Sequence, residues 1–519
     1  MLKILHIIKI PQILNTLFLA AFVVIGFFIL EGNIGFNLWD EGFLWYGAQR
    51  VMLGEVPIRD FMAYDPGRYY YLAALMSLLG NNGIIALRIA VAIFQTMGLF
   101  VGLLLIARTV KKQNFFYLLL SVVILAVWMF PRHKLFDISL SILLIGILAY
   151  LVQNPTSRRY LFTGLCVGLV AIFGRNHGMY GVAGSLGVML WLSIKRTEGP
   201  GLIKGFSLWV AGVITGFMPI LFMVLLVPGF AAAFWDGILF LFELKATNLS
   251  LPIPWPWQVN FKSVPLDVAI RGILVGLFFI ATIVFGVMSI VWVVWQKFQN
   301  KLVSPALVAA SFLALPYAHY AYSRADVGHL AQGIFPLLVG CLVLLATQSA
   351  KIKWPLVFML CAASLSVSHV FHPGWQCHIN KQCVNIEISG SNLLVDPGTA
   401  NDVRLLRQLA DQYAPKGQSF IATPFWPGAY ALLERKSPMW EIYALFPRPQ
   451  AFEQAEIERI KIAKPGFALV FDLPLDGNDE LRFRNTHPLI HQYILDNFQL
   501  LPNSPNPAYQ IYKAKGGAQ

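Results

Sequence analysis

The sequence predicts a polytopic α-helical membrane protein that carries a C-terminal α/β domain outside the membrane. Only 13% of the 519 residues are charged and 57% are hydrophobic, whereas about a quarter of the residues in a soluble domain are charged. The mean hydropathy is +0.63. The apolar segments continue to about Val370 and then stop, so we expect a membrane domain over residues 1–371 and an extracytoplasmic domain over residues 372–519.

Apolar runs separated by polar loops mark the membrane-spanning helices. A helix needs about 20 apolar residues to cross a bilayer, and somewhat fewer where flanking side chains reach the interface. About eleven segments meet this test: Ile13–Leu30, Ile89–Ala107, Phe115–Met129, Ile138–Val152, Tyr160–Phe173, Met179–Ile194, Phe206–Val227, Ile273–Trp295, Ala306–Tyr320, Leu330–Ala346 and Pro355–Val370. Basic residues precede the first segment and no small-residue cleavage site follows it, so we expect a signal anchor that stays in the protein.

Clusters of Lys and Arg set the orientation of these helices. The clusters are Lys3/Lys9, Arg108/Lys111/Lys112, Arg158/Arg159, Lys195/Arg196/Lys204, Lys297/Lys301 and Lys351/Lys353. All of them fall on one side of the membrane when the N-terminus is cytoplasmic, as the positive-inside rule requires. The C-terminal domain is then outside, and we expect the protein in a bacterial cytoplasmic (inner) membrane. The net charge of +13 therefore reflects topology, and we expect membrane lipids as partners and no nucleic acid.

The residues after Val370 alternate between helical and strand-like patterns. Cys377 and Cys383 lie in CHINKQC. In an oxidising compartment we expect these cysteines to form a disulfide, and a metal site that includes His378 is the alternative. Farther along we expect helices at Asp402–Tyr413, Phe452–Ile462 and Pro488–Asn497, strands at Ser419–Ala422 and Ala468–Phe471, and a linker at Ser389–Asn401.

The first outside loop, residues 31–83, is the strongest candidate for a chemical site. Asp40 and Glu41 follow directly on the first span, and an amphipathic segment comes next. Arg59, Tyr64 and Arg68 lie farther along, the last in a Pro-Gly-Arg turn before three tyrosines. A helix in the interface with aromatic side chains at headgroup level would build a floor at the membrane surface, with these three residues as candidate substrate-binding groups. The alternative is that Asp40 caps a helix and the tyrosines form an aromatic belt.

This order of features resembles the GT-C glycosyltransferases, above all the bacterial lipid A aminoarabinose transferases and the protein O-mannosyltransferases (family 39 and 83 type). The shared features are a first span, an outside Asp-Glu pair, an interfacial helix, a proline-containing turn before aromatics, and an arginine, here Arg88, that opens the second span. The resemblance is most specific over the first seven spans or so. It implies a GT-C fold and a hexosyl- or pentosyltransferase that uses a polyprenyl-phosphate-linked sugar as donor.

Two further motifs match members of this superfamily. FPRHKLFD places Arg132 and Asp137 as in the Arg-x-x-x-x-Asp arrangement of the mannosyltransferases. FGRNHG places Arg175 and His177 where related enzymes have a basic residue followed shortly by Gly, and we expect His177 as a substrate-binding group. Asp137 would lie at the membrane boundary, where burying a charge costs free energy and usually indicates a functional role. The alternatives are a helix N-cap for Asp137 and a snorkelling side chain for Arg175.

Two more outside segments complete the candidate site. YSRADVGHLAQGIFPLL carries Arg324 and His329 ahead of a proline-containing span, and it resembles the Arg-Tyr-x-x-Pro region whose basic residue holds the donor phosphate. The rigid run LPIPWPW contains Trp255 and Trp257. These indoles either cover the carrier's lipid or the sugar, or anchor the loop in the membrane.

The chemistry explains why such a site needs acids and cations. Displacing a lipid phosphate from an anomeric carbon requires a carboxylate that takes the acceptor's proton and cations that stabilise the departing phosphate. We expect Asp40 as the general base of an inverting reaction, with Glu41 as its neighbour and Asp137 orienting the acceptor or a phosphate-binding arginine. The donor phosphate would be held by Arg132, Arg175, Arg324 and His329. An Asp-Glu pair, unlike the Asp-x-Asp of metal-dependent oligosaccharyltransferases, does not demand a metal, so we expect no cofactor and leave a divalent metal open.

Two other classes of function are the alternatives. A transporter or flippase should carry charges near mid-membrane and often two related halves, but the acids here lie at the outer boundary and the sequence has no internal repeat. A non-catalytic envelope-assembly protein would not need an intact set of acids. The expected acceptor is a lipid, a protein or a glycan, and the C-terminal run from Pro424 to Pro447 either recognises it or packs against the membrane domain.

Overall fold

The computed structural model describes residues 10–110, 114–196, 199–244, 248–380, 382–502 and 504–516. The chain forms two compact units, which we call the helical unit (Met1–Gly32 with Val91–Trp375) and the α/β unit (Asn33–Ala90 with Gln376–Gln519). The first-loop residues thus cluster with the C-terminal residues, and the division expected at residues 371 and 372 stays a prediction. Four lysines of the expected basic clusters lie outside the described residues: Lys3, Lys9, Lys111 and Lys112.

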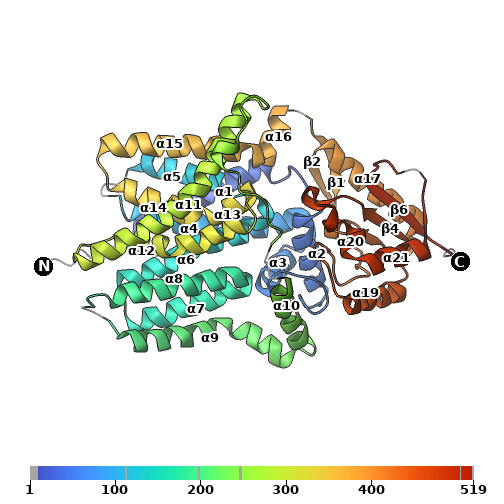
Figure 1. The fold of residues 1–519 in the computed structure, drawn as a ribbon, viewed down its shortest axis with the longest axis horizontal. Coiled ribbons are helices and arrows are strands. Elements are labelled where there is room, and N and C mark those ends of the chain that lie inside the picture. The colour runs from blue at the N-terminus through green and yellow to red at the C-terminus, as the bar shows by residue number, and fades with distance from the viewer. Residues whose placement is uncertain are drawn as a thin grey trace. The chain divides into compact units, whose positions relative to one another are not determined.

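The helical unit is built from long apolar helices (Figure 1). In chain order these are α1 (Ile10–Glu31), most of α4 (Ile84–Ala107), α5 (Phe115–Val127), α6 (Leu135–Gln153), α7 (Ser157–Phe173), α8 (Arg175–Ser193), α9 (Leu202–Leu226), α10 (Phe230–Leu244), α11 (Leu266–Phe298), α12 (Pro305–Ser323), α13 (Val327–Gly333), α14 (Phe335–Ala346) and α15 (Ala350–Ser368).

Each apolar segment expected to span the membrane falls on one of these helices or on the pair α13–α14. Within the described residues, 6 helices are long and apolar enough to cross a bilayer, and the pair α13–α14, bent by 53°, raises the number to 7 if it counts as one span. The polytopic helical membrane fold is therefore confirmed. The expected count of eleven crossings is not confirmed and stays a prediction.

Helices α7 and α9 pack backbone to backbone. Gly164 and Gly168 on α7 and Gly212 and Gly216 on α9 line the contact, and a Cβ added at any of the four would overlap a backbone carbonyl oxygen of the opposite helix. Both pairs have GxxxG spacing, which allows close approach in a membrane, where helix association depends on packing rather than on the hydrophobic effect. Figure 1 shows α7, α8 and α9 side by side.

The α/β unit combines the first loop with the C-terminal residues. The first loop contributes α2 (Asp40–Met52) and α3 (Pro66–Leu78). The C-terminal residues contribute most of α16 (Pro373–Asn380), and β1 (Val384–Ile388), β2 (Ser391–Val395), α17 (Pro397–Tyr413), β3 (Ile421–Thr423), α18 (Pro427–Leu432), α19 (Gln450–Ala463), β4 (Phe467–Phe471), α20 (Phe483–Thr486), α21 (Pro488–Asn497), β5 (Phe498–Leu500) and β6 (Tyr509–Ala514). The expected α/β character is confirmed, and every expected C-terminal helix and strand is present.

Four of the strands form a mixed sheet in the order β3-β4-β6-β5. Strand β3 runs parallel to β4, with Ile421 opposite Ala468, and β6 runs antiparallel to both of its neighbours. Every residue of β4 is buried, as is usual for a strand covered on both faces. Ile460 of α19 and Ile490 and Ile494 of α21 share one hydrophobic core with these strands.

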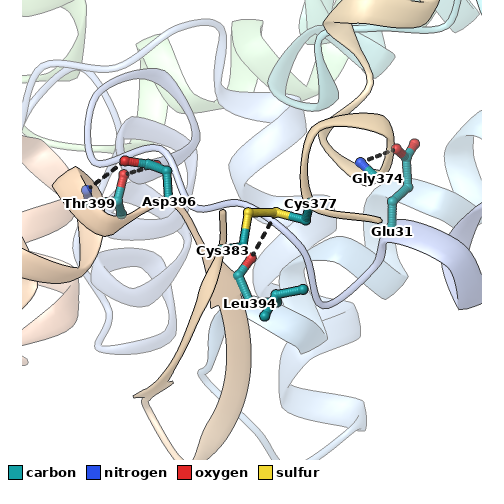
Figure 2. The surroundings of a disulfide bond; sticks show 7 residues. All are labelled: Glu31, Gly374, Cys377, Cys383, Leu394, Asp396 and Thr399. Atoms are coloured by element: carbon teal, nitrogen blue, oxygen red, sulfur yellow. Dashed lines mark hydrogen bonds between the residues drawn. A yellow bond between two sulfur atoms is a disulfide. The ribbon is translucent and has the colours of Figure 1, made fainter. Parts of the chain in front are cut away.

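A two-stranded hairpin, β1–β2, precedes this sheet. Ser389 and Gly390 form its turn with φ angles of 48° and 74°, and positive φ is what the favoured two-residue hairpin turns require. The linker expected at Ser389–Asn401 is therefore wrong, because its residues form the turn, strand β2 and the first turn of α17. Asp396 caps that helix by accepting hydrogen bonds from Thr399 N and Oγ1 at 2.9 and 2.6 Å (Figure 2).

Cys377 in α16 and Cys383 just before β1 are joined by a disulfide, with their Cα atoms 5.2 Å apart (Figure 2). The Cys377 sulfur lies 3.9 Å from the carbonyl oxygen of Leu394 on β2, so the bridge lies against the hairpin. Across the described ranges, no group of three or more His, Cys, Asp or Glu side chains could hold a metal ion.

Candidate functional site

Helix α2 carries the two adjacent acids. It starts at Asp40 because the Asn37 side chain accepts hydrogen bonds from the backbone N–H groups of Trp39 and Asp40, at 2.8 and 2.9 Å, a local bond that turns the chain. Both acids thus fall in the first helical turn, where the helix dipole stabilises negative charge. Every residue from Glu41 to Gln49 is buried, so the segment expected to be an amphipathic interfacial helix is enclosed by protein along its middle.

Glu41 is bound by Arg88, from the start of α4. Arg88 Nε and Nη2 donate to the two carboxylate oxygens of Glu41 at 2.8 Å each, and Nη2 also donates to Gly35 O at 2.7 Å. The exposed fraction of the side chain is 6% for Glu41 and 1% for Arg88. A two-pronged arginine–carboxylate pair is strong and geometrically specific. Both oxygens of Glu41 are therefore committed to a buried cation.

Asp40 has a different environment. Its side chain is partly exposed, and its Oδ1 accepts a hydrogen bond from the Tyr443 hydroxyl at 3.1 Å. Aromatic residues near it in the chain and Tyr443 itself form ring pairs: the Trp39 ring lies 4.9 Å from that of Phe425, and the Tyr443 ring lies 5.7 Å from that of Phe43, centroid to centroid. A partly exposed carboxylate that accepts a hydrogen bond from a phenol is suited to accept a proton.

The three candidate substrate-binding residues of the first loop make contacts within the α/β unit. Arg59 forms a two-pronged ion pair with Asp60 at 2.8 and 2.7 Å, and this hydrogen bond lowers the pKa of the Asp60 carboxyl below its ordinary value. The Arg68 guanidinium lies 5.0 Å from the centroid of the Tyr64 ring. Arg68 is buried, whereas the Arg59 side chain is 31% exposed. Arg59 is therefore the more accessible of the two arginines.

The C-terminal run from Pro424 to Pro447 packs against the first loop. Gly428 N donates to Leu38 O at 2.8 Å, and a Cβ at Gly428 would lie 2.7 Å from that oxygen. Trp440 Nε1 donates to Ile58 O at 2.9 Å. Packing against the first loop is thus one role of this run. A second is the hydrogen bond that Tyr443 donates to Asp40 of the acidic pair. Tyr443 was not among the expected site residues, and its place in this aromatic run is the only signal for it in the sequence.

In the helical unit, Asp137, His177 and Tyr317 form a buried chain of hydrogen bonds from α6, α8 and α12. His177 Nε2 lies 2.8 Å from Asp137 Oδ1, and its Nδ1 lies 2.8 Å from Tyr317 Oη. The imidazole thus bridges the Asp137 carboxylate at Nε2 and the Tyr317 hydroxyl at Nδ1. Asp137 is not the helix N-cap, because Lys134 holds that position. Asp137 orients His177.

Arg324, Asp326 and His329 form a second polar group in this unit. Arg324 Nε donates to Asp326 Oδ2 at 2.9 Å, and its Nη1 donates to Leu249 O at 3.2 Å. Asp326 Oδ1 caps α13 by accepting from His329 N at 2.8 Å and also lies 2.9 Å from His329 Nδ1. Burial raises the pKa of the Asp326 carboxyl, but the hydrogen bonds and charges of His329 and Arg324 together bring it below its ordinary value. An ionised Asp326 thus orients both basic residues.

The ring of Tyr320 lies between these two polar groups. Its centroid is 5.6 Å from that of His177 and 5.9 Å from that of His329, and its hydroxyl donates to Gln332 Oε1 at 2.6 Å. Candidate residues from three separate segments of the sequence are thus gathered in one region of the helical unit. Tyr317 and Tyr320 were not expected there, and the only signal for them is the density of Tyr and His near the end of a span, in PYAHYAYS.

Arg132 and Arg175 contact different parts of the helical unit. Arg132 Nη2 donates to Glu31 O at 3.0 Å and so binds the end of α1. Arg175 is the first residue of α8, and its guanidinium lies 5.7 Å from the centroid of the Phe234 ring on α10. Arg175 therefore shares a helical turn with His177, whereas Arg132 supports the packing of α1.

Trp255 and Trp257 stack on each other. Their ring centroids are 5.1 Å apart, their planes are 8° from parallel, and Trp257 is 70% exposed. The intervening Pro256 packs on Gly276 of α11, where an added Cβ would lie 2.6 Å from the proline Cδ. The two indoles are thus presented together on a rigid segment, as a stacking or anchoring surface requires.

The solved structures that are similar to this chain include two of ArnT. The crystal structure of ArnT from Cupriavidus metallidurans bound to undecaprenyl phosphate matches with a TM-score of 0.58 and 13% identity, covering 98% of this chain and 100% of that one. The crystal structure of the same ArnT in the apo state matches with a TM-score of 0.55 and 12% identity, covering 96% and 97%. No protein-family model and no curated protein sequence matches. The likeness confirms the expected GT-C fold.

Proposed function

We propose that this protein, which has the fold of ArnT, transfers a sugar from a polyprenyl-phosphate donor to a lipid, protein or glycan acceptor at the outer face of the cytoplasmic membrane. The mechanism is inverting, with Asp40 as the general base. The crystal structure of ArnT contains undecaprenyl phosphate, and the shared fold supports a lipid carrier of that kind here. The multi-pass helical unit supports a reaction at a membrane.

The observation that carries the proposal is the unequal environment of the two adjacent acids. Glu41 gives both oxygens to Arg88 in a buried pair, so a proton arriving there would disrupt that pair. Asp40 is partly exposed and is bound by the hydroxyl of Tyr443. A general base must reach the proton that it abstracts, and this favours Asp40 over its neighbour.

The reaction is a single displacement. The acceptor hydroxyl oxygen attacks the anomeric carbon while its proton passes to the Asp40 carboxylate. The bond between that carbon and the phosphate oxygen breaks, and the oxygen keeps the electron pair as polyprenyl phosphate departs. Attack comes from the face opposite the departing phosphate, so the configuration inverts. Negative charge grows on the phosphate as the bond breaks, and fixed cations stabilise it best there.

Arg324, Arg175 and His329 are the proposed phosphate-binding residues. The Arg324 side chain is 19% exposed and is oriented by Asp326, and a guanidinium offers a planar fork of donors that matches a phosphate. The Asp137–His177 pair holds the first turn of α8, on which Arg175 lies. We assign Asp137 and His177 a positioning role and Arg132 a supporting role.

A transfer assay tests the base. The full chain is reconstituted in proteoliposomes and supplied with a panel of polyprenyl-phosphate sugars and acceptors. Asp40→Asn should lower the transfer rate by about 10²- to 10⁴-fold, the usual contribution of a general base, with little change in the donor KM. Asp267→Asn is the matched control, because it makes the same chemical change at a carboxylate that is 75% exposed. Full activity in the Asp40→Asn protein would show that the base is wrongly assigned.

The same assay tests the phosphate-binding residues. Arg324→Gln and Arg175→Gln should each lower kcat by about 10²- to 10³-fold, because they remove a donor aimed at developing charge. Both substitutions should also weaken inhibition by the product, free polyprenyl phosphate. Arg404→Gln, at an exposed position on α17, is the control. A wild-type protein that moves the lipid-linked sugar across the membrane without transferring it would overturn the proposal in favour of a flippase.

A further inference from the structure

We propose that Tyr443 is the positioning residue of Asp40, so that the C-terminal part of the chain completes the general base. This inference rests on the proposed function and deepens it. The Tyr443 hydroxyl donates to Asp40 Oδ1 at 3.1 Å across 403 residues of sequence. Both residues belong to the α/β unit.

The position of Tyr443 is fixed by a backbone hydrogen bond of the next residue and by contacts of its ring. The next residue, Ala444, donates its N–H to Pro424 O at 2.7 Å, which ties the two ends of the C-terminal run together. The Tyr443 ring lies 5.7 Å from the Phe43 ring and 6.3 Å from the Phe425 ring, centroid to centroid. Aromatic pairs at these separations are attractive. The hydroxyl is therefore aimed by contacts that do not involve Asp40 itself.

The helix that carries Asp40 is held against the same run. A Cβ at Gly428 would lie 3.0 Å from the Gly42 Cα atom, so the two backbones are in direct contact there. Farther along α2, the Tyr46 hydroxyl accepts a hydrogen bond from Ser437 N at 3.0 Å. Because α2 and the C-terminal run are joined at several points, the distance between Asp40 and Tyr443 is set by the fold of the α/β unit.

A phenol that donates to one carboxylate oxygen has two effects on a general base. It stabilises the ionised form, which is the form that accepts a proton, and it fixes the orientation of the carboxylate plane. On α2 the neighbouring acid, Glu41, is neutralised by Arg88. From the C-terminal run, the Tyr443 hydroxyl donates directly to Asp40. Removing its hydroxyl should therefore alter both the rate and the pH at which Asp40 works.

The test is a pH–rate profile of transfer by the full chain in proteoliposomes. Tyr443→Phe keeps the ring and should lower kcat about tenfold, as expected for one hydrogen bond to a charged group. The acid limb of the profile should move to higher pH by about one unit, with the donor KM nearly unchanged. Tyr430→Phe is the matched control, because it removes the hydroxyl of a buried tyrosine that contacts the Ala422 backbone, and its acid limb should stay in place.

A second variant at position 443 tests the same role if Tyr443→Phe destabilises the protein. Difluorotyrosine incorporated at position 443 has a more acidic hydroxyl and is a stronger donor, so the acid limb should move to lower pH. In an Asp40→Asn background, Tyr443→Phe should add no further loss, because residues that act as one unit are not additive.

The outcomes distinguish a failure of the proposed transferase activity from a failure of the role proposed for Tyr443. A wild-type protein that is inactive with every donor would overturn the proposed function itself. An active wild-type protein whose acid limb is the same in Tyr443→Phe and in the difluorotyrosine variant would overturn the role of Tyr443 alone. A full additional loss in the Asp40→Asn background would show that Tyr443 acts on something other than Asp40.

Discussion

Asp40 and Glu41 are adjacent carboxylates, but we expect Asp40 to matter for sugar transfer and Glu41 to matter for stability. Replacing each by its amide in turn distinguishes the two roles. Glu41→Gln should destabilise the α/β unit, because it removes the charge that compensates a buried Arg88. Asp40→Asn should lower the transfer rate by about 10²- to 10⁴-fold but change the free energy of unfolding by no more than about 1 kcal/mol, the value of a charge at a helix N-terminus. The two substitutions differ by one position and make the same chemical change.

The size of the stability loss in Glu41→Gln follows from the geometry of the Glu41–Arg88 pair. Both carboxylate oxygens accept from the guanidinium at 2.8 Å, and the side chains are 6% and 1% exposed. Glutamine keeps one acceptor but turns an NH₂ group toward the guanidinium, and the buried positive charge loses its partner. Removing one member of a buried ion pair costs about 3–5 kcal/mol. For a domain of about 150–250 residues, such a loss of unfolding free energy corresponds to a fall in Tm of roughly 10 °C.

Thermal unfolding of the purified full chain in detergent measures this effect. Glu458→Gln is the control, because its side chain is 65% exposed and its ion pair with Lys461 lies at the surface, so its Tm should barely change. The double variant Glu41→Leu/Arg88→Met should recover part of the loss, since it leaves no unpaired charge. The reasoning is refuted if Glu41→Gln unfolds at the wild-type temperature, or if Asp40→Asn loses as much stability as Glu41→Gln does.

Three further predictions concern other parts of the chain. Tyr317→Phe removes a buried hydrogen-bond partner of His177 and should lower the free energy of unfolding by about 1–3 kcal/mol in denaturant titrations. Gly428→Ala should destabilise the protein by about 1–3 kcal/mol because the added Cβ meets backbone, whereas Gly237→Ala, with nothing within 4 Å, should not, by the same titration. Burial raises the pKa of the Asp402 carboxyl in the folded state, so its charge opposes folding once the pH rises from the ordinary carboxyl range through the folded pKa. Asp402→Asn should therefore stabilise the protein at neutral pH and lose this advantage in acid, which unfolding curves at several pH values will show.

The elements that the sequence predicted well are those whose signal is local. The apolar runs coincide with helices because apolar composition and helical periodicity are properties of neighbouring residues. Pro488–Asn497 matches α21 at both ends, since the proline opens that helix. The failure at Ser389–Asn401 is also local in origin. The strand Ser391–Val395 is only five residues long and lies between a tight turn and the capping Asp396, so its pairing with β1 is what reveals it.

By itself the sequence determined which segments form apolar helices, which residues after Val370 form the α/β elements, and that acids and arginines gather in the loops between spans. It marked Asp40 as the expected base and Glu41 as its neighbour, but it could not name the partner of either carboxylate. Only the tertiary structure shows those partners. Glu41 meets Arg88 and Asp40 meets Tyr443, and those partners are brought close by the packing of distant elements, which no local pattern encodes.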